Sequence, residues 1–378
     1  MRIGILTFHK SINYGSVLQA FALQSKLQSL GYDVSIIDYE PEKYLEMTKL
    51  FLTNGSVYQN LNILPIAFFQ KHKQNMFKRF RSNRLNLSEN TYYYNSDFRE
   101  LNNNYDCIIC GSDQIWNVAI KDCDDVYFLP GINIKKIAYS ISVGNSGNAL
   151  LTSDKELAQW INEFSSISVR EKETIDIIRE LIGYEKSIQQ TLDPTLLLDK
   201  ETYLKYMSHS YVSGDYIFLY NIWNGSDGFE IAETISEKLG MPVYAMLPAK
   251  NLTGLLKIKN HSIKFILYHS KPEDFLSLIQ KASFVITDSF HGTAFSLIFE
   301  KQFISVNYKK DEHQYKNDVR IINILGLFNL NDRYISKYDD ISIINSNQVD
   351  YDVVTPVRKQ LAENSIDILV NAIENGQK

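Results

Sequence analysis

The sequence has little cysteine and no long apolar run. It contains three Cys in 378 residues, and a small, odd number argues against a disulfide framework and is typical of a reducing compartment. No stretch approaches the ~20 apolar residues that a membrane-spanning helix needs. The apolar run Arg2–Phe8 is too short for a signal peptide and lacks a small-residue cleavage site. We therefore expect a soluble, cytoplasmic protein, at most in contact with the inner face of the membrane.

An excess of positive charge is also lacking. The chain carries 39 Lys and Arg against 44 Asp and Glu, which gives a formal net charge of −5 at pH 7. A nucleic-acid-binding protein normally has a basic footprint, so we expect no nucleic-acid partner. The composition leaves the oligomeric state open.

Patterns that hold metals or nucleotides are missing as well. The seven His are scattered, and Cys107 and Cys110 lie in an apolar segment. That segment favours a buried strand over half of a zinc site, because no second Cys pair completes the site. No GxGxxG is present, which argues against a dinucleotide site. We therefore expect no cofactor and no metal; the alternative is one magnesium ion held by Asp113 and Asp288.

What is present is a regular alternation of short apolar strands and helical segments. The expected strands are residues 2–7, 34–38, 106–110, 136–141 and 167–170 in a first block, and 216–220, 243–246, 284–287 and 303–306 in a second. Such strands are typical of a parallel sheet covered on both faces. We predict an α/β protein with two Rossmann-like domains, residues 1–203 and 204–350, facing a central cleft. Residues 351–378 are expected to pack back on the N-terminal domain as a helix that starts at Pro356, with Thr355 as N-cap.

Residues 42–104 are more polar and irregular, and they include a basic run. Its cations are Lys71, Lys73, Lys78, Arg79, Arg81 and Arg84. We favour a solvated helix face as the interpretation. Contact with an anionic lipid or a diphosphate-linked ligand is the alternative.

Polar segments follow several expected strands, at the carboxyl ends where open α/β sheets bind ligands. The first segment is Asn13-Tyr14-Gly15-Ser16, which opens a helix. The amides of a helix start can hold a phosphate or a carboxylate. The alternative is an ordinary helix cap formed by Asn13 or Ser16.

The second segment, Gly111–Asn117, follows a buried strand. Asp113, Gln114 and Asn117 can hydrogen-bond sugar hydroxyls, and Trp116 can stack on a sugar face. The alternative is a turn with Trp116 in the core. The crowding of polar groups favours a functional segment.

Two further junctions carry a cation and a proton carrier. Arg170, in Ile167–Glu171, can bind a phosphate or carboxylate through paired hydrogen bonds, or form an ion pair within the protein. His291 begins a helix after the strand 284–287 and can exchange a proton near neutral pH. Asp288 could orient His291, and Thr293 could add a hydrogen bond.

Together these segments resemble the polysaccharide pyruvyl transferase family. The resemblance rests on the order and spacing of segments 13–20, 111–117, 139–144, 168–171, 193–195 and 287–293. It implies a fold similar to GT-B glycosyltransferases, phosphoenolpyruvate as donor and a sugar hydroxyl pair as acceptor. The product would be a cyclic pyruvate ketal on a capsule or exopolysaccharide sugar, or on its lipid-diphosphate-linked precursor.

The resemblance also implies roles for particular residues. The family's His-Gly motif matches His291-Gly292, so the catalytic His carries over to His291. Some members have Arg where Ser289 stands here, and Arg170 and Arg320 are the candidates to replace that cation. The full donor set is Arg170, Arg320, Ser289, Gly292 and Thr293, on the side of the C-terminal domain. The acceptor set is Asn13, Tyr14, Gly15, Ser112, Asp113, Gln114, Trp116 and Asn117, on the side of the N-terminal domain.

Two other functions remain open at this stage. A GT-B glycosyltransferase that uses a nucleotide sugar would need the same fold and similar phosphate-binding loops. A non-catalytic sugar-binding protein would keep the Trp116 segment but would not need His291.

Overall fold

The structure is a computed structural model of the chain. It describes residues 1–41, 57–120, 123–145, 155–209, 212–222, 226–246, 263–266, 270–307, 309–311, 314–315, 317–336 and 347–375. The described chain forms two compact units. Unit 1 consists of Met1–Lys49, Arg81–Leu198 and Arg358–Lys378, and unit 2 of Leu50–Phe80 and Asp199–Val357.

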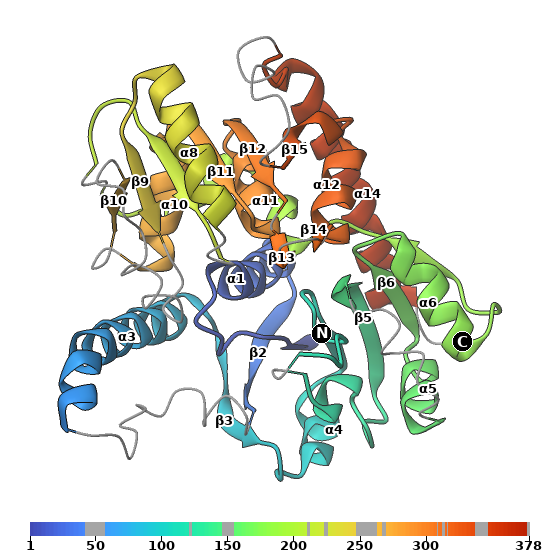
Figure 1. Ribbon diagram of the computed structural model, residues 1–378. Helices are drawn as coiled ribbons and strands as arrows, with labels where there is room; N and C mark the ends of the chain where they lie inside the picture. Colours follow the sequence, from blue (N-terminus) through green and yellow to red (C-terminus); the bar gives the residue numbers. More distant parts are fainter. Residues whose placement is uncertain are drawn as a thin grey trace. The chain divides into compact units, whose positions relative to one another are not determined.

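Unit 1 is built on a parallel sheet, which has seven strands in the part of the chain described (Figure 1). The sheet order is β3-β2-β1-β4-β5-β6-β7, and its central strands read as apolar runs because both faces are covered. The strands are β1 Arg2–Leu6, β2 Asp33–Glu40, β3 Leu87–Tyr93, β4 Cys107–Cys110, β5 Lys135–Ile141, β6 Ser166–Val169 and β7 Ile188–Gln190. The helices that follow them include α1 Tyr14–Ser29, α4 Leu101–Asn104, α5 Lys155–Asn162 and α6 Glu173–Ile182.

Unit 2 repeats this architecture with a second parallel sheet, of six strands among the residues described. The sheet order is β10-β9-β8-β11-β12-β15. The strands are β8 Ile217–Tyr220, β9 Val243–Met246, β10 Ile263–Phe265, β11 Phe284–Thr287, β12 Gln302–Val306 and β15 Tyr334–Ile335. Its helices include α8 Ser226–Leu239, α10 Pro272–Lys281, α11 Phe290–Ile298 and α12 Val319–Leu327, and a small antiparallel pair joins β13 Lys309–Asp311 to β14 Gln314–Tyr315.

The strand order reverses once in each sheet. In unit 1, β1 pairs with β2 on one side and with β4 on the other. In unit 2, β8 pairs with β9 on one side and with β11 on the other. Open α/β sheets bind ligands outside the carboxyl ends of the strands at such a reversal. A ligand site is therefore expected at the loops after β1 and β4, and at those after β8 and β11.

Each of two long helices is divided between the units, one part of its residues belonging to unit 1 and the other to unit 2. These helices are α3 Val57–Arg84 and α14 Tyr351–Asn375. The predicted start of the last helix at Pro356 is wrong. The helix begins five residues earlier, where the Asp350 carboxylate accepts a hydrogen bond from the amide of Asp352. The hydroxyl of Thr355 caps nothing and instead donates to the Glu300 carboxylate over 3.0 Å.

Candidate active site

A buried hydrogen-bond network joins the loops after β1 and β4 at the strand reversal of unit 1. The amide group of Gln19 on α1 donates to the Thr7 hydroxyl over 2.7 Å, and its oxygen accepts from the backbone N–H of Ser112 over 3.2 Å. Thr7 in turn donates to the carbonyl of Ser112 over 3.1 Å. All three residues are fully or almost fully buried. The network therefore fixes the polypeptide that enters the Asp113 segment.

Asp113 is the residue that this network positions. Its backbone lies in the left-handed region at φ 76°, which is uncommon for a residue other than Gly and is typical of functional sites. One carboxylate oxygen accepts from the Ser16 hydroxyl over 2.7 Å, and the other accepts from the amide of Gln114 over 2.9 Å. Its carbonyl accepts from the amide of Ser142. Asp113 is thus held from α1 through its carboxylate and from the segment after β5 through its backbone.

Arg170 follows β6 and lies in a cluster of carboxylates. Its guanidinium donates to Glu171 over 2.7 Å and to Asp193 over 3.0 Å, and it lies 4.0 Å from Asp113. Burial alone would lower the pKa of Arg170, but the attraction of Glu171, Asp193 and Asp113 raises it above its ordinary value. The structure therefore favours the alternative interpretation of Arg170, an ion pair within the protein, over a cation left available for the donor.

Asp193 is a member of this cluster to which the sequence assigned no role. It is buried, and it accepts from both the amide and the hydroxyl of Thr195, over 3.0 and 2.7 Å. Its second oxygen lies 3.4 Å from the Ser112 hydroxyl. The segment 193–195 belongs to the family resemblance, and that was the available signal.

Asn13 is a helix cap, as the alternative interpretation proposed. Its side-chain oxygen accepts from the amides of Gly15 and Ser16, over 2.9 and 3.5 Å. Tyr14 and Gly15 are buried in the first turn of α1. Two amides of the helix start are therefore already occupied, which weakens the expectation that they hold a phosphate or carboxylate.

The predicted stacking of Trp116 on a sugar is wrong. Its side chain is completely buried, and its indole stacks on Phe128 and meets Phe164 edge to face. Its N–H donates to the carbonyl of Tyr127 over 3.1 Å. The apolar part of the indole is packed, and its N–H is hydrogen-bonded, inside the core of unit 1. The side chain is therefore not available to a ligand.

Gln114 and Asn117 bond to each other. The Asn117 amide donates to the Gln114 side-chain oxygen over 2.9 Å, and Asn117 also accepts from the amide of Ala119. Gly144 approaches the pair so closely that a Cβ there would lie 2.3 Å from the Gln114 oxygen. Asn117 is buried and Gln114 half-buried, so Gln114 is the more accessible of the two.

The corresponding reversal in unit 2 is formed around the end of β11. Asp288 is buried and accepts from the amide of Ile222, in the loop after β8, over 2.6 Å. Ser289 is the N-cap of α11 and accepts from the amide of Gly292 over 3.3 Å. A Cβ on Gly292 would lie 2.2 Å from the Thr287 hydroxyl. Only glycine lets α11 start this close to β11.

His291 stands in the first turn of α11, at this reversal, and is buried. Its ring meets Phe290 edge to face at 5.1 Å between centroids. Thr293 is fully buried, and its hydroxyl bonds to the Ser289 carbonyl and to Ser305, over 3.0 and 2.7 Å. Thr293 therefore joins α11 to β12, and its hydroxyl is engaged within the protein.

The second candidate for the missing donor cation, Arg320, also makes an ion pair. Its guanidinium forms two hydrogen bonds to Asp318, the N-cap of α12, over 2.9 and 2.5 Å. Both candidate cations, Arg170 and Arg320, are therefore paired with carboxylates of the protein. Within the described ranges, no group of three His, Cys, Asp or Glu side chains is arranged to hold a metal ion.

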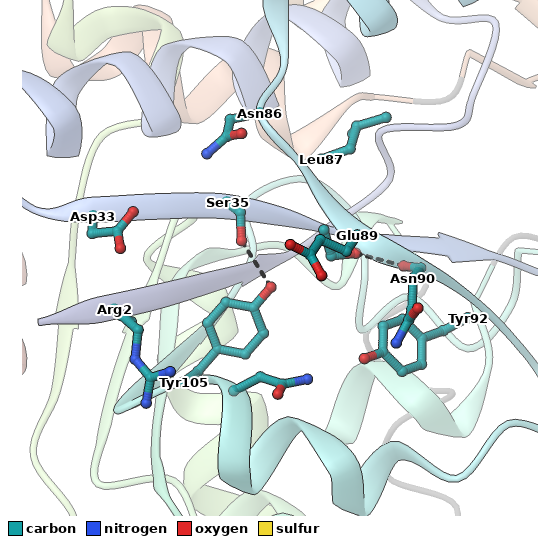
Figure 2. A pocket seen from close by; sticks show the side chains of 11 residues that line it. Arg2, Asp33, Ser35, Asn86, Leu87, Glu89, Asn90, Tyr92 and Tyr105 are labelled. Carbon is teal, nitrogen blue, oxygen red and sulfur yellow. Dashed lines mark hydrogen bonds between the residues drawn. The ribbon is translucent and has the colours of Figure 1, made fainter.

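A separate polar cavity of about 410 Å³ lies in unit 1 and involves none of the predicted site residues (Figure 2). Arg2 and Asp33 line it from the starts of β1 and β2, away from the strand reversal. Ser35 and Tyr105 form a 2.8 Å hydrogen bond between their hydroxyls on its wall. Its position at the amino ends of the strands separates it from the candidate site.

Comparison with known proteins identifies the family. A model of polysaccharide pyruvyl transferases matches residues 13–310, which include the loops after β4, β8 and β11. The chain belongs to the polysaccharide pyruvyl transferase family. No curated protein sequence matches it. The segments on which the resemblance was based, from Asn13 to Thr293, all lie within the matched residues.

Solved structures show the same fold at low sequence identity. A putative UDP-N-acetylglucosamine 2-epimerase from Listeria monocytogenes is similar with a TM-score of 0.50 and 10% identity, over 100% of this chain and 97% of that chain. The enzyme from Neisseria meningitidis gives 0.51 and 9%, over 99% of each chain. The enzyme from Methanocaldococcus jannaschii gives 0.50 and 13%, over 98% and 99%. These similarities confirm the predicted GT-B-like class with two Rossmann-like domains. Among the helices described, none is long and apolar enough to cross a membrane.

Proposed function

We propose that this transferase moves the pyruvyl group of phosphoenolpyruvate to two hydroxyls of a sugar, in a surface polysaccharide or its lipid-linked precursor. The observation that carries the proposal is the position of His291. It stands at the start of α11, at the strand reversal of unit 2, inside the region that matches the family. The UDP-GlcNAc epimerases support the fold alone, so the choice of donor rests on the family and on this residue.

The donor chemistry needs a proton carrier and a place for a phosphate. In the proposed reaction His291 gives a proton to the methylene carbon of phosphoenolpyruvate, which makes the adjacent C2 electrophilic. The first sugar hydroxyl adds to C2 and loses its proton to a base. The bond from C2 to the phosphate oxygen then breaks, phosphate leaves with the electron pair of that bond, and the second hydroxyl adds to C2. Its proton returns to His291, which had given one to the methylene carbon. The positive end of α11, capped by Ser289, suits the negative charge of this donor.

The acceptor chemistry needs a base, and we propose Asp113 for that role. One guanidinium and three carboxylates, those of Asp113, Glu171 and Asp193, form a cluster with an excess of negative charge among the described residues. Such a cluster repels an anionic donor but accepts hydrogen bonds from sugar hydroxyls. We assign Asp113 to the hydroxyl proton, and Arg170 to the positioning of Asp113 and Asp193.

The test is to supply the purified protein with carbon-labelled phosphoenolpyruvate and an envelope glycolipid extract as acceptor. Parallel samples receive labelled UDP-sugars in place of phosphoenolpyruvate. We expect label in the glycolipid and release of phosphate only with phosphoenolpyruvate, together with a ketal methyl signal in the product's NMR spectrum. Transfer from a UDP-sugar would support a glycosyltransferase instead. Binding of the glycolipid without any transfer, and equally by the His291→Ala variant, would support a sugar-binding protein.

A further inference from the structure

We propose that one face of α3 docks the protein on an anionic membrane surface. This docking face consists of Phe68, Lys71, Lys78 and Arg79, and it needs neither the reaction nor the sites described above. Helix α3 spans Val57–Arg84 and is one of the longest helices of the chain (Figure 1). Residues 68–79 of this helix belong to unit 2.

The helix has two faces of opposite character. Phe69, Lys73, Phe77 and Phe80 are buried. At 100° per residue these four lie on one side of the helix, and Phe68, Lys71, Lys78 and Arg79 lie on the other. The second group is exposed, and Phe68 has 72% of its surface open to solvent. Asn75 and Ser82, also exposed, continue this face without adding charge. Within residues 68–80, the buried face accounts for the packing of the helix, and Phe68 does not belong to that face.

The charge of α3 is opposite in sign to the net charge of the whole protein. Its 28 residues include six Lys and Arg and no Asp or Glu, whereas the chain has a formal net charge of −5. An anionic surface therefore repels the chain as a whole and attracts this helix. The attraction orients the protein as it approaches, with the docking face leading.

A membrane fits the docking face better than a soluble polyanion does. A polyanion would use the three exposed cations and leave Phe68 in water. A bilayer interface accommodates both the cations and Phe68. The cations contact lipid headgroups, and the phenyl ring enters the boundary between headgroups and acyl chains.

The experiment measures binding of the full chain to phosphatidylcholine vesicles with and without phosphatidylglycerol, at low and high salt. We expect binding only to the anionic vesicles, and weaker binding at high salt because exposed charges are screened. The triple variant Lys71→Gln, Lys78→Gln, Arg79→Gln should bind roughly 100-fold more weakly. Each cation near an anionic surface raises the affinity about fivefold. The variant Phe68→Ser should also weaken binding.

Matched controls come from exposed residues elsewhere. The triple variant Lys205→Gln, Lys238→Gln, Lys359→Gln makes the same change in net charge at other exposed positions. Tyr184→Ser removes an aromatic residue that is also 72% exposed. Both controls should bind like the unchanged protein, and unfolding curves should coincide for all variants.

Three outcomes would overturn the proposal. The first is no binding to the anionic vesicles. The second is an equal loss in the control triple variant, which would show that net charge alone decides binding. The third is tight binding of soluble polyphosphate that depends on the three cations, with vesicle binding unaffected by Phe68→Ser. That result would assign the face to a soluble polyanion.

Discussion

The hydroxyl of Ser16 donates a 2.7 Å hydrogen bond to the carboxylate of Asp113, which joins the first turn of α1 to the loop after β4. The two residues are 97 positions apart in the sequence, and both are buried. Because the opposite oxygen of Asp113 is held by the amide of Gln114, the carboxylate has one orientation. A base that must meet a sugar hydroxyl gains from such a fixed position.

Asp113→Asn should lower turnover by at least ~100-fold, because an amide cannot accept the hydroxyl proton. Ser16→Ala keeps the carboxylate and should lower turnover less. It should also cost about 1.5–3 kcal/mol of stability, the usual contribution of a hydrogen bond to a charged group. Steady-state kinetics and urea unfolding of the two variants measure these effects. Turnover of Asp113→Asn close to that of the unchanged enzyme would exclude Asp113 as the base.

His291→Ala should remove at least ~100-fold of turnover while the fold survives, since this is the typical contribution of a general acid or base. The matched control is His209→Ala, because His209 is exposed and stands outside α11. The control should keep full turnover. If the two variants are equally active, His291 is not the proton carrier.

Arg170→Met should destabilise the protein strongly. The change leaves the carboxylates of Glu171, Asp193 and Asp113 buried without their guanidinium, and breaking a buried ion pair from one side typically costs about 3–5 kcal/mol. Arg99→Met removes the cation of the exposed Arg99–Asp97 pair and should change stability little. Chemical unfolding of both variants provides the comparison. A stable Arg170→Met variant with a raised Michaelis constant for phosphoenolpyruvate would instead support a role of Arg170 in donor binding.

Gly292→Ala should disturb the start of α11, because the new Cβ would lie 2.2 Å from the Thr287 hydroxyl. Overpacking of this kind typically costs about 1–3 kcal/mol, and turnover should fall with it because His291 is the preceding residue. Gly326→Ala in α12 is the control. Its Cβ meets no atom closer than 3.7 Å, so it should be neutral or slightly stabilising. The double variant Gly292→Ala, Thr287→Gly should recover part of the lost stability and turnover. Its second change removes the Thr287 side-chain atoms that the new Cβ would contact.

Lys73 should make stability depend on pH in the alkaline range. Burial lowers the pKa of Lys73 from 10.5 to about 7. Between these values the unfolded chain holds a proton that the folded protein has lost, so stability rises with pH from about 7 to 10.5. Lys73→Met should remove this rise and be more stable at pH 7, whereas Lys71→Met, at an exposed site, should keep it. Parallel curves for the unchanged protein and Lys73→Met would show that Lys73 is not the source.

The strands at the centre of each sheet could be predicted from the sequence, whereas the edge strands could not. The segment 284–287 was predicted as a strand with the bounds that β11 has, because a strand buried on both faces is a continuous apolar run. Strand β3, Leu87–Tyr93, was missed. It lies at the edge of its sheet and most of its residues are partly or fully exposed, so the apolar run is absent.

For the candidate site, positions could be predicted but the directions of side chains could not. His291 and Asp113 were expected at strand ends and lie there, since the end of an apolar run marks the end of a strand. Trp116 was placed against a ligand, yet its N–H bonds to a carbonyl eleven residues later. Arg170 bonds to Asp193, which is 23 residues away. Partners at such separations are set by the packing of β4, β6 and β7, which local sequence does not reveal.

Unit 1 draws on three separate stretches of chain, and the last of them is the end of α14. The Ser365 hydroxyl accepts from the amide of Leu192, and the Lys135 side chain donates to the carbonyl of Ile373. At the usual pace of synthesis, the ribosome needs roughly 10–30 s to pass from residue 198 to residue 358. During that interval the nascent unit 1 lacks its closing helix and leaves part of its surface uncovered. Slower synthesis of unit 2 would lengthen this exposure, so the chain's yield in cells should depend on translation speed and chaperone supply.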